Sequence, residues 1–116
     1  MRYFDVFHKD LHVSRVWFDF RTEQVTFENY VNDILWCPFG KKTSATFGDL
    51  ETFWEERCFP RTRVNAKEVL RLLGVDYYDP YDIVRKTHGV QNEDFCWLRF
   101  DDEEGMITYA DVKFRD

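Results

Sequence analysis

Hydrophobic and polar residues alternate along the first third of the chain, with the period typical of antiparallel strands. The alternation falls into three runs, and a short polar turn separates each run from the next: residues 3–8, 13–20 and 25–30. We therefore predict an N-terminal meander of three strands. Residues 34–37 are a candidate for a further short strand, after which Pro38 and Gly40 end regular structure.

The middle of the chain changes to a helical period, and capping residues delimit two helices there. Thr46 stands three residues before Asp49, at capping-box spacing, and the helix that it begins stops before Pro60. Asn65 is the expected N-cap of the second helix, which closes on Gly74 as its left-handed terminator.

A third helix has the clearest signals, with Asp79 as cap, Pro80 in the first turn and Gly89 after the last turn. Alternation then returns over residues 95–100, which predicts a strand that rejoins the sheet, and a last short element covers residues 108–114. The order of strands, helices and strands favours an α+β fold. We expect an antiparallel sheet, built from the meander and the C-terminal strand, packed against about three short helices.

Length and composition are those of one folded domain spanning residues 1–116. Aromatic residues make up 19% of the chain, enough large rings for a compact core. The net charge of −6 disfavours binding to duplex nucleic acid, because affinity for phosphates comes from clustered Lys and Arg. The three widely spaced cysteines suit a reducing compartment, and no run approaches the ~20 apolar residues of a membrane span. We expect a cytoplasmic protein without membrane contact.

Residues that could support catalysis or metal binding are sparse. His8 and His12 are separated by a predicted turn, and no cysteine pair has zinc-ligand spacing, so we expect neither a metal site nor a cofactor. Arg57 and Arg61 lie close to Cys58 and could lower the pKa of its thiol, although its aromatic neighbours favour a core position. His88 has no evident partner as a general base. We therefore expect a protein that is not an enzyme.

Two charged features are candidate partner-binding sites. The first consists of Arg57, Arg61 and Arg63, which surround Pro60 at a helix junction and could grip carboxylates or phosphates. The alternative is internal pairing with three acidic residues of the flanking helices: Glu55, Glu56 and Glu68.

The second feature is the acidic turn, which we define as Asp101, Asp102, Glu103 and Glu104. The last sixteen residues contain six acids and two bases, so they carry −4 of the net −6. Such a run is either a solvated turn or a patch that docks on a basic groove of a partner.

The stretch from Phe53 to Phe100 resembles a known family. The resemblance is carried by a Pro-containing turn followed by Arg, a helix that closes on Gly, a further helix, and a strand with an aromatic residue; these are residues 53–63, 73–74, 79–84, 87–89 and 94–100. The pattern is similar to the small N-terminal subdomain of HipA-family kinases, and closer to the small stand-alone proteins encoded beside such kinases in Gram-positive bacteria and their mobile elements. The kinase's ATP-binding and catalytic segments have no counterpart in this chain.

The resemblance implies a regulatory or inhibitory protein that binds a larger bacterial protein such as a HipA-like kinase, in the manner of a toxin–antitoxin pair. A rival hypothesis is a phage or mobile-element anti-defence protein, similar in action to an anti-CRISPR, whose acidic turn blocks the nucleic-acid channel of a defence nuclease. A third hypothesis is a single-strand or RNA binder that uses the aromatic-rich sheet with Arg57, Arg61 and Arg63. The net negative charge of the protein opposes this hypothesis.

Overall fold

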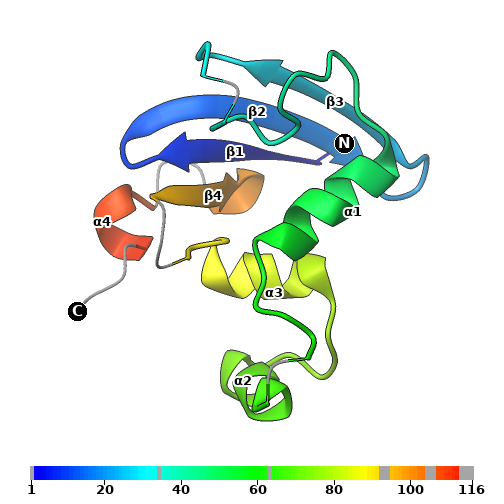
Figure 1. Ribbon diagram of the computed structural model, residues 1–116, viewed down its shortest axis with the longest axis vertical. Helices are drawn as coiled ribbons and strands as arrows, with labels where there is room; N and C mark the ends of the chain where they lie inside the picture. The colour runs from blue at the N-terminus through cyan, green and yellow to red at the C-terminus, as the bar shows by residue number, and fades with distance from the viewer. Residues whose placement is uncertain (1, 34, 63, 92–94, 104–106, 113–116) are drawn as a thin grey trace.

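Four strands form one antiparallel sheet in the order β3-β2-β1-β4 (Figure 1). The structure is a computed structural model that describes residues 2–33, 35–62, 64–91, 95–103 and 107–112. The strands are β1 Arg2–His8, β2 Leu11–Asp19, β3 Gln24–Asn29 and β4 Cys96–Phe100. The predicted meander and the returning C-terminal strand are both confirmed, and β4 joins the sheet beside β1, the first strand of the chain.

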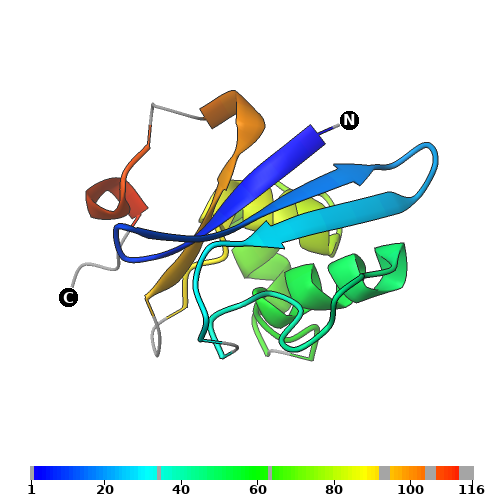
Figure 2. The same cartoon turned by 90° about the horizontal axis from the view of Figure 1, so that it is seen from above.

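Helices α1 Phe47–Glu56 and α3 Pro80–Thr87 lie on one side of the sheet, and α2 Ala66–Leu73 lies farther out beside α3 (Figures 1 and 2). After β4 come a short 3₁₀ helix, η1 Asp101–Glu103, and one helical turn, α4 Tyr109–Val112. The protein is therefore α+β, with an antiparallel sheet packed against three short helices. No helix in the described ranges has the length and apolar run needed to cross a bilayer.

The helix boundaries follow the capping residues in the sequence. Thr46 and Asp49 form a reciprocal capping box at the start of α1, with both backbone-to-side-chain bonds present at 3.0 and 3.1 Å. Asn65 occupies the N-cap of α2 but makes no side-chain capping bond. Gly74 ends α2 in the left-handed conformation, as predicted. For α3 the cap is Asp79, which accepts a hydrogen bond from the N–H of Tyr81.

Two details of the predicted structure are wrong. Residues 35–37 form a turn and not a strand, because Asp33 captures the backbone N–H of Leu35 with its side chain and that of Trp36 with its carbonyl. Helix α3 also ends one residue earlier than expected: His88 itself adopts the left-handed conformation, with φ of 59°, before Gly89. The last predicted element is the turn of helix α4, and residues 113–114 lie outside the described residues.

Aromatic rings from the sheet and from α1 make the centre of the core. Phe4, Phe18 and Phe100 come from three different strands and are fully buried. Phe4 packs on Phe100 with ring centroids 5.5 Å apart, and Phe18 meets Trp54 of α1 edge to face at 5.3 Å. Such pairs add about 0.5–1.5 kcal/mol each beyond the area they bury. The even-numbered positions of β1 and β4, and those of β2 beyond residue 13, thus hold the helices on the sheet.

A β-bulge interrupts the pairing of β1 with β2. Val6 pairs with Ser14 but Phe7 pairs with His12, which leaves Val13 as an extra residue on β2. Val13 is fully buried in the core. The bulge therefore lets Val13 face the helices while His12, next to it in the chain, lies on the opposite face of the sheet beside Phe7.

Candidate functional site

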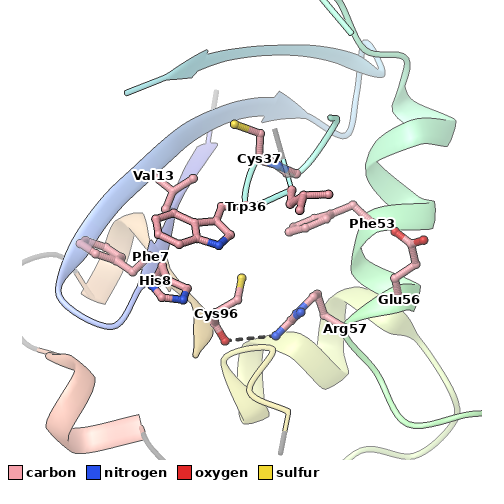
Figure 3. A pocket seen from close by; sticks show the side chains of 11 residues that line it. Phe7, His8, Val13, Trp36, Cys37, Phe53, Glu56, Arg57 and Cys96 are labelled. Carbon is pink, nitrogen blue, oxygen red and sulfur yellow. Dashed lines mark hydrogen bonds between the residues drawn. The ribbon is translucent and has the colours of Figure 1, made fainter. Parts of the chain in front are cut away.

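Arg57 has a structural role at the C-terminal end of α1. Its guanidinium donates to the carbonyl of Gly89 at 2.9 Å and to the carbonyl of Cys96 at 3.1 Å, the contact drawn in Figure 3. One arginine thus connects α1 with the α3–β4 turn and with the first residue of β4. Because its donors are engaged inside the protein, Arg57 is not placed to grip an external carboxylate or phosphate.

Arg61 is the exposed member of the arginine group. Its guanidinium lies 4.3 Å from the ring centroid of Tyr78 and 3.4 Å from a carboxylate oxygen of Glu55. Pairs as exposed as this contribute little to stability, so Arg61 remains accessible to a partner. Arg63, the third arginine of the predicted site, lies outside the described residues.

The acidic turn is tied to the body of the protein by two arginines from distant segments. Asp101 accepts two close bonds from Arg2, at 2.6 and 2.8 Å, and Asp102 accepts two from Arg85 of α3, at 2.8 and 2.6 Å. The neighbouring guanidinium holds the pKa of each of these carboxyls below its usual value. The pairs fix η1 against both β1 and α3.

Glu103 is likewise engaged by internal partners. One carboxylate oxygen lies 2.8 Å from Nε2 of His88, and the other accepts the backbone N–H of Phe100 at 3.0 Å. The structure therefore gives each of these three carboxylates a cationic or titratable partner of its own, and Glu104 lies outside the described residues. These contacts favour the interpretation that the turn stabilises the fold.

A buried carboxylate lies on the face of the sheet that points away from the helices, and no charge pattern in the sequence indicates it. Asp5 is fully buried, and its oxygens lie 2.7 Å from Nε of Arg15, 2.9 Å from Nε2 of His12 and 3.4 Å from Arg99. The three partners come from β2 and β4, the strands on either side of β1. Alternation predicts that Asp5, Arg15 and Arg99 point away from the helices, but only the strand order brings them together. His12 reaches the same face because of the bulge at Val13.

Aromatic rings surround this cluster, and the same guanidiniums cover them. Arg15 lies over the ring of Tyr3 at 4.2 Å, and Arg99 lies over Phe7 at 4.7 Å. Phe7 also stacks on Trp97 at 4.6 Å, and Trp97 is almost fully buried. Because these rings are already stacked, little ring surface is left for nucleic-acid bases, which weakens the third hypothesis.

The thiols are poorly suited to nucleophilic chemistry. Burial raises the pKa of Cys58 to about 12, and its thiol donates to the carbonyl of Trp54 at 3.1 Å. The nearby arginines therefore do not activate it, and its placement is that of a core residue. Burial also raises the pKa of Cys37, whose thiol donates to the carbonyl of Asp33. Within the described ranges, no three His, Cys, Asp or Glu side chains are grouped so as to hold a metal ion.

The cavity in Figure 3 lies between the end of β1, the 35–38 turn and α1, and has a volume of about 340 Å³. Trp36 stacks flat on His8 with ring centroids 4.0 Å apart, and the thiol of Cys96 points toward the hollow. The remaining wall combines Cys37 and the charged Glu56 with five apolar residues: Phe7, Val13, Leu35, Pro38 and Phe53. With His8 stacked on Trp36 and Arg57 engaged by carbonyls, the cavity is a recess of mixed polar and apolar lining, and its described residues form no hydrogen-bonded acid–base pair.

The outer edge of β4 is closed by hydrogen bonds. The N–H of Lys9 on the β1 side donates to the carbonyl of Phe95, so the odd-numbered residues of β4 bond to β1. The even-numbered residues of β4 therefore direct their backbone groups away from β1. The N–H of Leu98 donates to the carbonyl of His88 at 2.8 Å, and Arg57 and Glu103 bind the next groups on either side. Both predicted charged sites thus take part in blocking this edge against another strand.

The outer edge of β3 is open by comparison. Tyr30 donates its N–H to the carbonyl of Val13, so the even-numbered residues of β3 direct their backbone N–H and C=O groups toward β2. Val25, Phe27 and Asn29 therefore direct their backbone N–H and C=O groups away from the sheet. In the parts of the chain that the structure describes, no hydrogen bond satisfies these groups.

Comparisons with protein-family models, with curated proteins and with solved structures find no match to this chain. The class that the structure itself defines is an α+β domain with one closed and one open sheet edge.

Proposed function

We propose that this protein is a non-catalytic regulatory module that binds and restrains a larger protein. The partner class that we propose is a HipA-like kinase, on the basis of the resemblance over residues 53–100. The observation that carries the proposal is the open edge of β3. An edge strand with unpaired backbone groups is a template for an extended segment of another protein.

The contrast between the two edges supports this reading. On β4, separate contacts occupy the carbonyl of Cys96 and the N–H groups of Leu98 and Phe100, which interrupts the edge against strand addition. On β3, the sequence Gln24–Asn29 contains no Pro and no Lys, the residues that commonly protect edges, and Glu28 is its one charged side chain. A partner strand would satisfy backbone groups that make no hydrogen bond in the described part of the chain.

The side chains of β3 indicate what kind of segment would fit. Val25 and Phe27 are half-buried on the helix side, where Phe27 packs on Phe39 with ring centroids 4.9 Å apart. Glu28 is exposed on the opposite face and makes no ion pair within the described residues. We expect a partner segment with apolar residues on one side and a Lys or Arg beside Glu28 on the other.

The alternative of an acidic anti-defence protein has less support. It requires carboxylates that imitate phosphates, whereas Asp101, Asp102 and Glu103 are each paired within the fold. A bidentate ion pair presents a weaker field than a single carboxylate, because the guanidinium cancels most of the charge. We therefore place the binding surface at β3 and not at the acidic turn.

A proline substitution at the outer edge of β3 tests the proposal. Val25→Pro removes one outward N–H and keeps the ladder with β2, and Val25→Thr is the matched control that retains the N–H and the β-branched shape. The wild type and Val25→Thr should form a stable 1:1 complex with a HipA-like kinase from the same genome and reduce its autophosphorylation. Val25→Pro should bind about tenfold more weakly, the effect of about 1.4 kcal/mol for a lost hydrogen bond. Equal binding by both variants would refute the role of the edge, and no binding by wild type would refute the kinase as partner.

A further inference from the structure

A second cavity, of about 260 Å³, lies where the end of β2 meets helices α1 and α3. It is separate from the β3 edge and from the cavity of Figure 3, with which it shares no residue. Four aromatic side chains, two acidic ones and a proline line it: Phe20, Phe47, Glu51, Trp54, Asp79, Pro80 and Tyr81.

The four rings enclose the cavity from different directions. Phe20 meets Phe47 at an interplanar angle of 69° and Tyr81 at 78°, while Phe47 and Trp54 are almost perpendicular at 89°. Their centroids are 5.0–6.5 Å apart in these three pairs, so the rings form inclined walls and not one flat stack. Phe20 is half exposed at 49%, which leaves one wall accessible from solvent. The arrangement comes from three separate segments of the chain.

The charged groups in the lining have one sign. Glu51 is exposed on α1, and Asp79 directs one oxygen to the N–H of Tyr81, while its other oxygen makes no hydrogen bond within the described residues. No Lys or Arg is among the lining residues. Arg2 and Arg85 lie near Tyr81, but their guanidiniums hold Asp101 and Asp102 in bidentate pairs.

We propose that this cavity binds an organic ammonium group. Aromatic faces attract a cation by about 0.5–2 kcal/mol each. Phe20 is exposed and the rings of Phe47 and Tyr81 are partly exposed, whereas Trp54 closes the buried end of the cavity. Two carboxylates add a long-range attraction for positive charge and repel anions. A metal ion is a poor match for these walls, because hard cations require several oxygen ligands where this cavity offers rings. The proposal does not depend on the β3 edge or on the identity of the protein partner.

The shared chemistry, an alkylated or primary ammonium, has two possible sources: a small free amine or the side chain of a lysine. The probes are choline, its uncharged isostere 3,3-dimethylbutan-1-ol, and Nα-acetyl-lysine amide with and without trimethylation of its side-chain amine. Binding is followed by the NMR signal of the Trp54 indole N–H, which is buried and has no hydrogen-bond partner within the described residues. Any change at the walls should shift this signal.

We expect saturable shifts with choline that are lost or weakened by about tenfold with the uncharged isostere, which has the same shape without the charge. A stronger response to the lysine derivatives than to choline would assign the site to a lysine side chain; the reverse would assign it to a free amine. Glu51→Gln should weaken binding, whereas Glu55→Gln, a change on the same helix outside the cavity, should not. Phe20→Leu should also weaken binding. Because the ring of Phe20 is half exposed, its removal should disturb the fold less than removal of a buried ring.

Equal binding of choline and its isostere would overturn the proposal, because the cavity would then select shape and not charge. Absence of a saturable shift with every cationic probe would overturn it as well. Kinase binding is not measured in this experiment, so its outcome is independent of the function proposed above. The Asp79→Asn variant keeps a good helix N-cap, and a folded but non-binding Asp79→Asn protein would support the electrostatic part of the proposal.

Discussion

Replacement of Asp5 by Asn tests the role of the buried charge cluster. The carboxylate is fully buried, while the side chains of Arg15 and Arg99 are 25% and 19% exposed, so the change leaves two poorly solvated guanidiniums without a counter-ion. Breaking a buried ion pair from one side costs about 3–5 kcal/mol. Because both guanidiniums retain some contact with water, we expect the lower end, a loss of about 3 kcal/mol in the free energy of unfolding.

Urea unfolding followed by tryptophan fluorescence measures this loss. With an m-value of about 1.5 kcal/mol/M, the midpoint should fall by about 2 M. Asp10→Asn, in the exposed turn before β2, is the matched control and should change the free energy by no more than about 0.5 kcal/mol. Adding Arg99→Met to Asp5→Asn should restore part of the stability, since it removes one uncompensated charge. The reasoning is refuted if Asp5→Asn costs no more than Asp10→Asn.

Two further predictions concern residues beside the closed edge of β4. The folded state lowers the pKa of Asp101 and of Asp102, so their stabilising contribution is present above the unfolded pKa of about 3.9 and is lost as the pH falls through the folded values. Thermal midpoints between pH 5 and pH 2 should fall less steeply for Asp101→Asn/Asp102→Asn than for wild type, and parallel curves would contradict this. Gly89→Ala should lose about 2 kcal/mol, because Gly89 has φ of 66° and an added Cβ would lie 3.3 Å from two side-chain carbons. Gly40→Ala has a similar φ of 58° but open space around it, so chemical denaturation should show a smaller loss of about 1 kcal/mol.

Local chemistry explains why most of the secondary structure could be predicted. The capping box at Thr46, the left-handed Gly74 and the Asp79–Pro80 start of α3 act within one helical turn, so nearby residues suffice to recognise them. The prediction was wrong at residues 35–37, where the side chain of Asp33 captures the backbone locally and prevents a strand. Period-two alternation cannot detect that competition, because it depends on hydrophobicity and not on hydrogen bonds.

The candidate sites were harder to predict, because the sequence shows where the charged residues are but not which residues they bind in the fold. Arg57 and the acidic turn are conspicuous in the sequence, yet in the fold they bind carbonyls and cations that lie up to 99 residues away. Asp5, by contrast, is a single acid in an ordinary alternating strand. It becomes the centre of a cluster with Arg15, Arg99 and His12 only because β1 lies between β2 and β4.

Short-range information thus accounts for where strands and helices begin and end, which side of each faces the core, and the α+β class. The place of β4 beside β1 depends on contacts between segments far apart in the chain, and so do the open edge of β3, the closed edge of β4 and the ring-lined cavity beside α1. Those contacts arise when the chain closes loops to bury its aromatic core. Alternation and short turns specify most of the buried residues and the meander, but not the strand beside which β4 inserts.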